Sequence, residues 1–276
     1  MKHVVVSGSF DNLGSPGVRF LEEASRLGQV NVLLWSDETC QACTGSLPKF
    51  PQAERAYLVQ AIRYVSHVTI VDETARRSVH DLPDRLDFKP DVWVVQGEAG
   101  DDPRKRAYCQ VHGLEYQVIG SDRLEGFPIV ALQDAQGSSP RRKVVVTGCY
   151  DWFHSGHVRF FEEVSGLGDL YVVVGSDPNV RLLKGEGHPL FPQDERRYMV
   201  QSIRYVCQAL VSSGQGWMDA EPEIALIKPD LYAVNEDGDK PEKRQFCLEH
   251  GIEYVVLRRA PKAGLPRRQS TDLRGF

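Results

Sequence analysis

The sequence lacks long hydrophobic runs and an excess of basic residues. No apolar run in its 276 residues approaches the roughly 20 residues that span a bilayer, and its start lacks the basic and apolar regions of a signal peptide. The net charge of -5 argues against a nucleic-acid partner, for which a strongly basic domain is expected. We therefore expect a soluble protein of the cytoplasm, with no membrane span and no nucleic-acid partner.

Cysteine is also scarce, since six cysteines are too few in a chain of this length for a disulfide framework. Cys40 and Cys43 are spaced like half of a structural zinc site, and no second pair follows them. We predict no metal ion held by protein side chains alone, although the sequence leaves open whether this pair binds one.

One pattern occurs twice along the chain. Residues 4–23 read VVVSGSFDNLGSPGVRFLEE, and residues 144–163 read VVVTGCYDWFHSGHVRFFEE. Further matched segments follow in the same order: 50–55 with 191–196, 60–65 with 201–206, and 89–91 with 228–230. This unit is far longer than the repeats of about 20–50 residues that build solenoids. We predict two tandem domains, residues 1–136 and 141–276, joined by a Gln-, Gly- and Ser-rich linker at 133–140.

Each half alternates short apolar runs with segments of helical spacing. In the second half the runs are residues 144–147, 170–174, 210–212, 231–234 and 254–257. Continuously apolar runs are typical of parallel strands that are buried on both faces. We therefore predict an α/β fold with two tandem Rossmann-like, doubly wound parallel sheets. Because the linker is short, we expect the two domains to pack as a pseudo-dimer, with residues 63–65 and 204–206 near their interface.

The two halves differ in their histidines. His154 and His157 of the second half correspond to Gly14 and Gly17 of the first. The histidines follow a strand that ends at Gly148, and they open the next helix, where free N–H groups favour anions. Such a pair can donate hydrogen bonds to phosphate oxygens. A zinc pair, with Asp151 as a further ligand, and two helix-capping histidines are the alternatives.

Three segments of the second half resemble signatures of the His-x-Gly-His nucleotidyltransferase superfamily. The segment 148–157 is similar to the superfamily motif, and 203–206, Ile-Arg-Tyr-Val, resembles a signature of the cytidylyltransferase branch. The segment 270–272, Ser-Thr-Asp, resembles a third signature that contacts the triphosphate, although its aspartate replaces a hydroxyl residue. The resemblance extends to cytidylyltransferases for glycerol 3-phosphate, phosphocholine and phosphoethanolamine, of which the last also has tandem domains.

The resemblance implies transfer of CMP from CTP to a phosphorylated alcohol or polyol, with release of pyrophosphate and with Mg²⁺ bound to the nucleotide. It assigns catalysis to His154, His157, Lys184 and Arg204. The nucleotide-binding residues that we predict are Thr147, Gly148, Tyr150, Asp151, Gly156, Glu236, Arg268, Ser270 and Thr271. The first domain, without the motif, would be a degenerate copy.

Two alternatives to CMP transfer stay open. An adenylyltransferase of the same superfamily would use ATP, because base choice can depend on main-chain contacts that a sequence does not reveal. A regulatory protein would bind the nucleotide without turnover. The acceptor and the oligomeric state, a monomer with an internal pseudo-dimer or a dimer of such chains, are not determined by the sequence.

Overall fold

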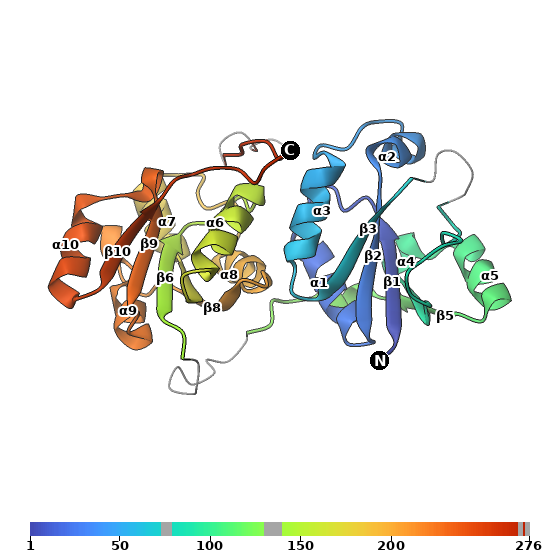
Figure 1. Cartoon of the computed structure of the whole chain (residues 1–276), viewed down its shortest axis with the longest axis horizontal. Coiled ribbons are helices and arrows are strands. Elements are labelled where there is room, and N and C mark those ends of the chain that lie inside the picture. Colours follow the sequence, from blue (N-terminus) through green and yellow to red (C-terminus); the bar gives the residue numbers. More distant parts are fainter. Residues whose placement is uncertain (73–78, 130–139, 270–272, 274–276) are drawn as a thin grey trace. The chain divides into compact units, whose positions relative to one another are not determined.

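The computed structural model describes residues 1–72, 79–129, 140–269 and 273, and the chain divides into two compact units (Figure 1). Unit 1 is Met1–Gly126 and unit 2 is Phe127–Phe276. Each unit contains one five-stranded sheet in which every strand pairing is parallel. The prediction of two tandem α/β sheets is therefore confirmed, whereas their packing as a pseudo-dimer stays a prediction.

The sheet of unit 1 has the strand order β3-β2-β1-β4-β5. Its strands are β1 (His3–Gly8), β2 (Gln29–Trp35), β3 (Val65–Val71), β4 (Val92–Gln96) and β5 (Glu115–Ile119). Its helices are α1 (Ser15–Ser25), α2 (Asp37–Thr44), α3 (Gln52–Ala61), α4 (Gly97–Gly100), α5 (Pro103–His112) and the 3-10 turn η1 (Ser121–Leu124).

The sheet of unit 2 repeats this topology, with the order β10-β9-β6-β7-β8. Its strands are β6 (Lys143–Gly148), β7 (Asp169–Val174), β8 (Val206–Val211), β9 (Leu231–Asn235) and β10 (Glu253–Leu257). Its helices are α6 (Ser155–Ser165), α7 (Asp177–Lys184), α8 (Gln193–Gln201), α9 (Glu221–Ile227) and α10 (Pro241–His250), with 3-10 turns η2 (Gly216–Met218) and η3 (Glu236–Gly238).

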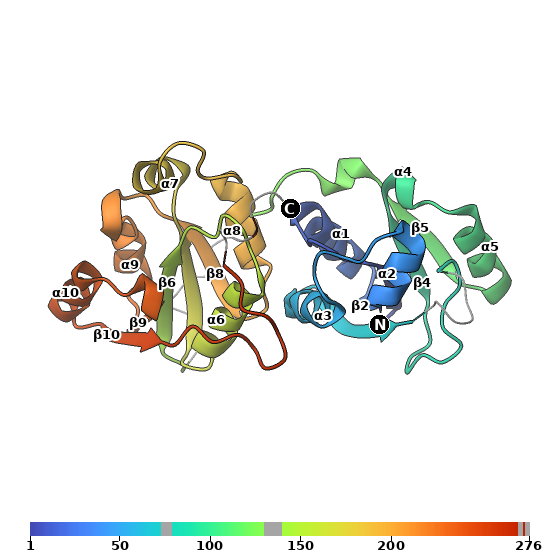
Figure 2. The same ribbon diagram turned by 90° about the horizontal axis from the view of Figure 1, so that it is seen from above.

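Helices cover both faces of the unit 2 sheet, which explains the unbroken valine run of β6 (Figures 1 and 2). Val144, Val145 and Val146 are all fully buried. Helices α9 and α10 form one core cluster with Val145 and Tyr232, while α6 and α8 pack against β7 and β8. A polar side chain on either face of this central strand would lose its water without gaining a partner. The sequence pattern therefore fixes β6 as the centre of the fold.

The unit boundary falls before the predicted linker. The ring of Phe127 packs 5.7 Å from that of Tyr198, and Arg197 donates to the carbonyl oxygens of Phe127 and Pro128 at 3.3 and 3.2 Å. These contacts bind the chain to unit 2 before residue 133. The predicted linker itself lies, except for Pro140, outside the described residues.

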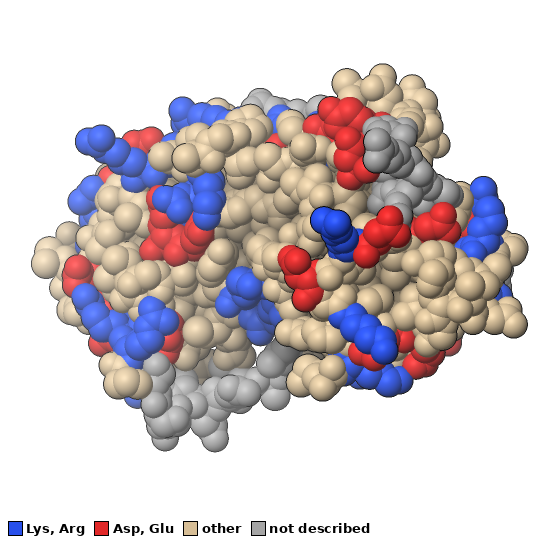
Figure 3. Space-filling view, turned by 45° about the vertical axis from the view of Figure 1, so that its right-hand side comes forward, with Lys and Arg blue, Asp and Glu red and all other residues tan. Residues whose placement is uncertain are grey.

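The sequence predicts no strongly basic domain, no disulfide framework and no membrane-spanning helix. In the face that Figure 3 presents, basic and acidic side chains are interspersed. No helix in the described segments is long and apolar enough to cross a membrane. Cys40 is buried, Cys43 is exposed and both are free thiols. Over the same described segments, no group of three or more His, Cys, Asp and Glu side chains is arranged to hold a metal ion.

Candidate active site

The candidate site lies at the carboxyl ends of β6 and β9. Because β6 pairs with β7 on one side and β9 on the other, the strand order reverses here, and a crevice forms at such a point in an open parallel sheet. A cavity of about 180 Å³ occupies the position. Its lining includes Thr147, Gly148, Cys149, Tyr150, Asp151, Gly156, His157, Lys184, Asn235, Asp237, Lys243 and Arg259.

The two histidines hold each other in place at the start of α6. His154 is the N-cap residue, and its Nδ1 accepts the backbone N–H of Gly156 at 3.1 Å. The Nδ1 of His157 accepts the backbone N–H of His154 at 3.4 Å. A neutral imidazole that accepts through Nδ1 carries its proton on Nε2. Both rings therefore present an Nε2–H donor, and that of His154 is buried with no hydrogen-bond partner in the described part of the chain.

Burial keeps both imidazoles neutral at pH 7. It lowers the pKa of His154 to about 4, and the positive charges of Arg259 and Arg268 contribute to the same effect. Burial also lowers the pKa of His157 well below its usual value, helped by His154, Arg259 and Lys184. The ring centroids are 4.0 Å apart and nearly parallel, with 24° between the planes. The pair therefore offers two neutral donors instead of two charges.

Helix capping and phosphate binding are thus compatible roles for these histidines, because capping uses Nδ1 and leaves Nε2. The zinc alternative needs a third ligand, for which the sequence suggested Asp151. The carboxylate of Asp151 instead accepts the N–H groups of Leu190 and Phe191 at 2.7 and 3.1 Å and lies 3.1 Å from His188 Nδ1. Asp151 therefore holds the loop that follows α7, and this use of both its oxygens also argues against its predicted contact with the nucleotide.

Tyr150 and Gly148 shape the floor of the cavity. Tyr150 is buried with a positive φ of 54°, and its ring meets that of His157 edge-on at 5.3 Å. A Cβ atom on Gly148 would lie 2.8 Å from the Tyr150 ring, so only glycine fits there. Burial raises the pKa of the Tyr150 phenol, which is therefore uncharged. Tyr150 supports the imidazole of His157, and its placement favours this supporting role over a polar contact with a nucleotide.

Lys184, at the end of α7, lies at this cavity as the sequence predicts. It lines the cavity beside His157, and its charge lowers the pKa of that histidine. Arg268 also lies near the pair, because its charge lowers the pKa of His154 and its carbonyl oxygen is 3.6 Å from the Cβ position of Gly156. The structure thus brings both predicted cations to the histidines.

Arg204 lies elsewhere. It is exposed between α8 and β8, before the first residue of β8. All strands of this sheet run parallel, so the amino end of β8 lies at the opposite edge from the carboxyl end of β6. The expected contact of Arg204 with the nucleotide or the acceptor is not supported by the geometry of this unit.

Two more predicted residues differ in their position relative to the cavity. Glu236 is exposed at the start of η3, while its neighbours Asn235 and Asp237 line the cavity. Gly156, between the histidines, lines the cavity as predicted. Ser270 and Thr271 lie outside the described residues.

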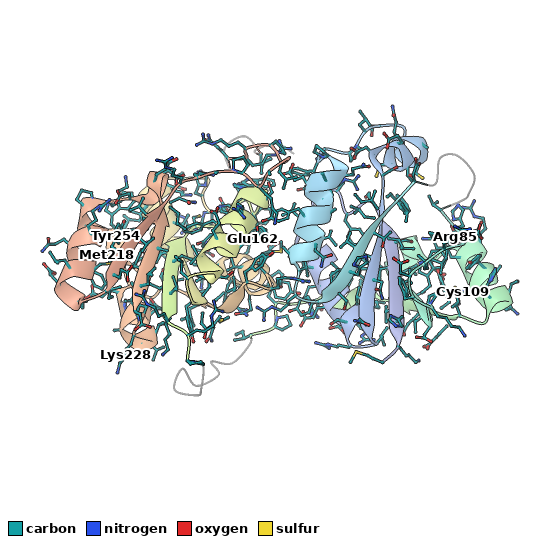
Figure 4. All side chains as sticks on the ribbon, viewed as in Figure 1. Arg85, Cys109, Glu162, Met218, Lys228 and Tyr254 are labelled. Carbon is teal, nitrogen blue, oxygen red and sulfur yellow. The ribbon has the colours of Figure 1, made fainter. Side chains whose placement is uncertain are left out.

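Arg259 is a cation of the site that the sequence analysis did not single out. It follows β10, lines the cavity and forms an ion pair with Asp237. Its guanidinium also donates to the carbonyl oxygen of Arg268 at 3.1 Å. The segment after β10 is held against α6 by Lys262, whose Nζ lies 2.6 Å from Glu162, labelled in Figure 4. These contacts place a run that is distant in sequence beside the histidines.

Lys243, on α10, was missed by the sequence reasoning. Its Nζ lies 3.5 Å from Thr147 Oγ1 and 5.7 Å from the centre of the Tyr232 ring. Burial lowers its pKa, and the charge of Asp219 opposes that shift. The signal that could have revealed it is the Lys-Arg pair at 243–244, which recurs at 105–106 in the first half.

Comparisons with known proteins agree with this arrangement. The cytidylyltransferase-like family model matches residues 145–262. FAD synthase of Ferroglobus placidus is 37% identical over 120 residues, which cover 42% of this chain and 75% of that protein. FAD synthase of Methanocella paludicola is 33% identical over 119 residues, with 42% and 81% covered.

Two further matches are more partial. The bifunctional protein HldE of Pelobacter propionicus is 31% identical over 110 residues, 40% of this chain and 22% of that protein. A solved lipopolysaccharide core biosynthesis protein from Thermoplasma volcanium, 24% identical, aligns with a TM-score of 0.38 over 44% of this chain and 98% of its own. On its family match and its FAD synthase relatives, the chain belongs to the cytidylyltransferase-like family of His-x-Gly-His nucleotidyltransferases.

Proposed function

We propose that unit 2 transfers a nucleoside monophosphate from a nucleoside triphosphate to the phosphate group of a small acceptor. An acceptor oxygen attacks the α-phosphorus, the bond from that phosphorus to the β-bridging oxygen breaks, and pyrophosphate leaves. The observation that carries this proposal is the histidine pair, whose Nδ1 atoms are bound to backbone N–H groups while the Nε2–H donors remain for phosphate oxygens.

The chemistry asked of these side chains is positioning and charge stabilisation. The two imidazoles donate hydrogen bonds as negative charge grows on the α-phosphate, and they need no reorganisation because the backbone already orients them. Lys184, Lys243 and Arg259 line the same cavity and offset the charge of the triphosphate. The anion in turn favours the charged form of Lys243, which burial alone disfavours.

Mg²⁺ is proposed as a companion of the nucleotide. It usually keeps several waters and binds through substrate phosphates with one or two carboxylates. Asp151 and Asp237 both line the cavity. Because Asp151 binds the loop after α7, the carboxylate that remains for a metal ion is Asp237, which is paired with Arg259. These residues fit a metal ion that arrives with the triphosphate, whose charge it would partly neutralise.

ATP is the donor that we propose first. Two relatives with high coverage are named FAD synthase, and FAD is AMP joined to FMN through a pyrophosphate bond, so its synthesis from FMN is an adenylyl transfer. The segment 203–206, which suggested cytidine, contains Arg204 and so lies at the far edge of the sheet from the cavity. CTP is the second candidate, because the family model is that of cytidylyltransferases.

Release of pyrophosphate from the full chain tests this function. ATP and CTP with Mg²⁺ are each combined with FMN, glycerol 3-phosphate, phosphocholine and phosphoethanolamine, and the parent is compared with His157→Ala. We expect release that depends on an acceptor, is faster with ATP and is lost in the variant. If a nucleotide bound but no combination of nucleotide and acceptor released pyrophosphate, the regulatory alternative would be favoured. Faster release with CTP than with ATP would favour CMP transfer.

A further inference from the structure

Unit 1 has a crevice at the place where unit 2 has its cavity. It lies at the carboxyl ends of β1 and β4, where the strand order of the sheet reverses. Its volume is about 820 Å³, against about 180 Å³ in unit 2. Gly14 and Gly17, the counterparts of the two histidines, line it, so it lacks the imidazole pair of unit 2, and His80 lines it from elsewhere in the unit. Ligand pockets of proteins commonly have volumes of about 300–1,000 Å³.

A buried lysine lines this crevice. Lys105, on α5, is the counterpart of Lys243, and only 9% of it is exposed. Its ammonium lies 5.2 Å from the centre of the Trp93 ring, and within the described side chains it has no ion pair. Figure 4 labels Cys109, one turn further along the same helix. Burial lowers the pKa of Lys105, so a bound anion would favour its charged form.

The hydroxyl of Ser7 is a second polar group of the crevice without a partner. Its counterpart, Thr147, shares a hydrogen bond of 2.7 Å with the hydroxyl of Tyr232. Trp93 stands in the place of Tyr232 and has no hydroxyl to offer. The Oγ atom of Ser7 is consequently buried with no hydrogen-bond partner among the described residues. Buried polar groups usually have such a partner, and here a ligand can supply it.

The carboxylates of the crevice form no ion pair with Lys105 among the described side chains, although the charge of Asp102 partly opposes the effect of burial on the pKa of Lys105. Asp101 accepts both hydrogen bonds of Arg106, at 2.9 and 2.7 Å. Asp102 lies 2.6 Å from His80 Nδ1 and also pairs with Arg104. Asp11 accepts the backbone N–H groups of Lys49 and Phe50, as Asp151 does for its own loop. Each carboxylate therefore has a partner of its own.

Part of the lining is aromatic and apolar. Phe10, Phe20 and Trp35 all border the crevice. Trp35 is the last residue of β2, where unit 2 has Gly175 after β7. Planar rings bind against such side chains by offset stacking. One end of the crevice thus suits an anion and its walls suit a flat ring.

We propose that unit 1 binds a nucleotide, with a phosphate at Lys105 and Ser7 and the aromatic ring against the wall of Trp35. It would hold this ligand without reaction, because no imidazole stands where His154 and His157 stand in unit 2. The proposal does not depend on the function proposed for unit 2.

Calorimetric titration of the full chain with ATP, CTP and FMN tests it, with His157→Ala as the parent so that unit 2 cannot turn over. We expect a second equivalent of at least one probe to bind. Lys105→Met should weaken that second binding by at least about 30-fold, the usual loss when one partner of a buried charge pair is removed. Lys105→Arg, which keeps the charge, should retain it.

Lys2→Met is the matched control, because Lys2 precedes β1 at the opposite edge of the same sheet and pairs with Glu115. It should leave both equivalents unchanged. The proposal would be overturned if no probe showed an equivalent whose binding Lys105→Met weakens. If the chain with His157 intact released no pyrophosphate while the equivalent that depends on Lys105 still bound, the function proposed for unit 2 alone would be overturned.

Discussion

Acid should destabilise unit 2 through His154, and His154→Asn should remove that part of the acid sensitivity. His154 is 1% exposed, and burial lowers its pKa to about 4. In the unfolded chain a histidine has a pKa of about 6.5. Between pH 6.5 and 4 the unfolded state therefore binds a proton that the folded state excludes. Stability is lost as the pH falls through this window and is unaffected by this group above it.

The magnitude follows from the two pKa values. From pH 7 to pH 4.5, a group with these values lowers the free energy of unfolding by about 2 kcal/mol. His157, whose pKa is also depressed, adds to the loss in the parent and remains in the variant. Asparagine is among the preferred N-cap residues, so His154→Asn keeps a cap for α6 while removing the titrating ring.

Amide hydrogen exchange in β6 and α6 measures the opening of unit 2 within the full chain. After correction for the intrinsic effect of pH on exchange, the parent should lose about 2 kcal/mol more protection than His154→Asn between pH 7 and 4.5. His250→Asn, at an exposed histidine of the same unit, is the control and should behave like the parent. Equal losses for parent and His154→Asn would refute the reasoning, as would an NMR titration of His154 near pH 6.5.

Three further predictions concern the site and the two units. His157→Ala should lower the turnover number about 10² to 10³-fold, because it removes one oriented donor, with circular dichroism unchanged; a rate within twofold of the parent would exclude this role. Arg259→Met should raise the pKa of His154 in an NMR titration, since the arginine charge lowers it, whereas Arg258→Met should shift it less; no difference between the two would contradict this. Residues 141–276 expressed alone should self-associate in sedimentation or unfold more easily if the units pair as expected, and an equally stable monomer would oppose the pairing.

The sequence was sufficient for the fold because burial on both faces leaves a direct mark on it. The valine runs at 4–6 and 144–146 are the central strands, and both are fully buried. Duplication then required the same strand order in each unit, which the structure has. The unit boundary was harder to place. Phe127 and Pro128 belong to unit 2 because they contact α8, and the amino-acid composition around them does not indicate these contacts.

The site residues that could be predicted are those in a local motif or in segments assigned from the family resemblance, such as Lys184 and Arg268. His154, Gly156 and His157 form one motif, and the geometry brings them together. Lys243 and Arg259 reach the cavity from α10 and from the segment after β10, so their proximity depends on which strands are neighbours. Arg204 shows the reverse case. Its segment resembles a family signature, but a residue just before a parallel strand lies at the edge away from the carboxyl ends.

What the two units share is the frame of the crevice and not its reactive groups. Arg55 and Arg196 are both nearly fully buried. The guanidinium of each donates to the carbonyl oxygen of a phenylalanine that lies just before its own helix, Phe50 at 2.9 Å and Phe191 at 2.8 Å. Each also pairs with the aspartate that begins the preceding helix, Asp37 of α2 at 2.8 Å and Asp177 of α7 at 2.6 Å.

The arginine of each pair is buried while its aspartate is partly exposed, so removing the aspartate would leave a buried charge with fewer partners, which is destabilising. The frame is therefore constrained by folding alone, whether or not the unit reacts. A buried pair of neutral imidazoles is different, because it lowers the stability of the fold in acid. Folding alone therefore gives no reason to retain it, whereas a catalytic role does. Loss of the histidines from unit 1 thus removes a burden on stability and leaves a crevice that folding still holds open for a ligand.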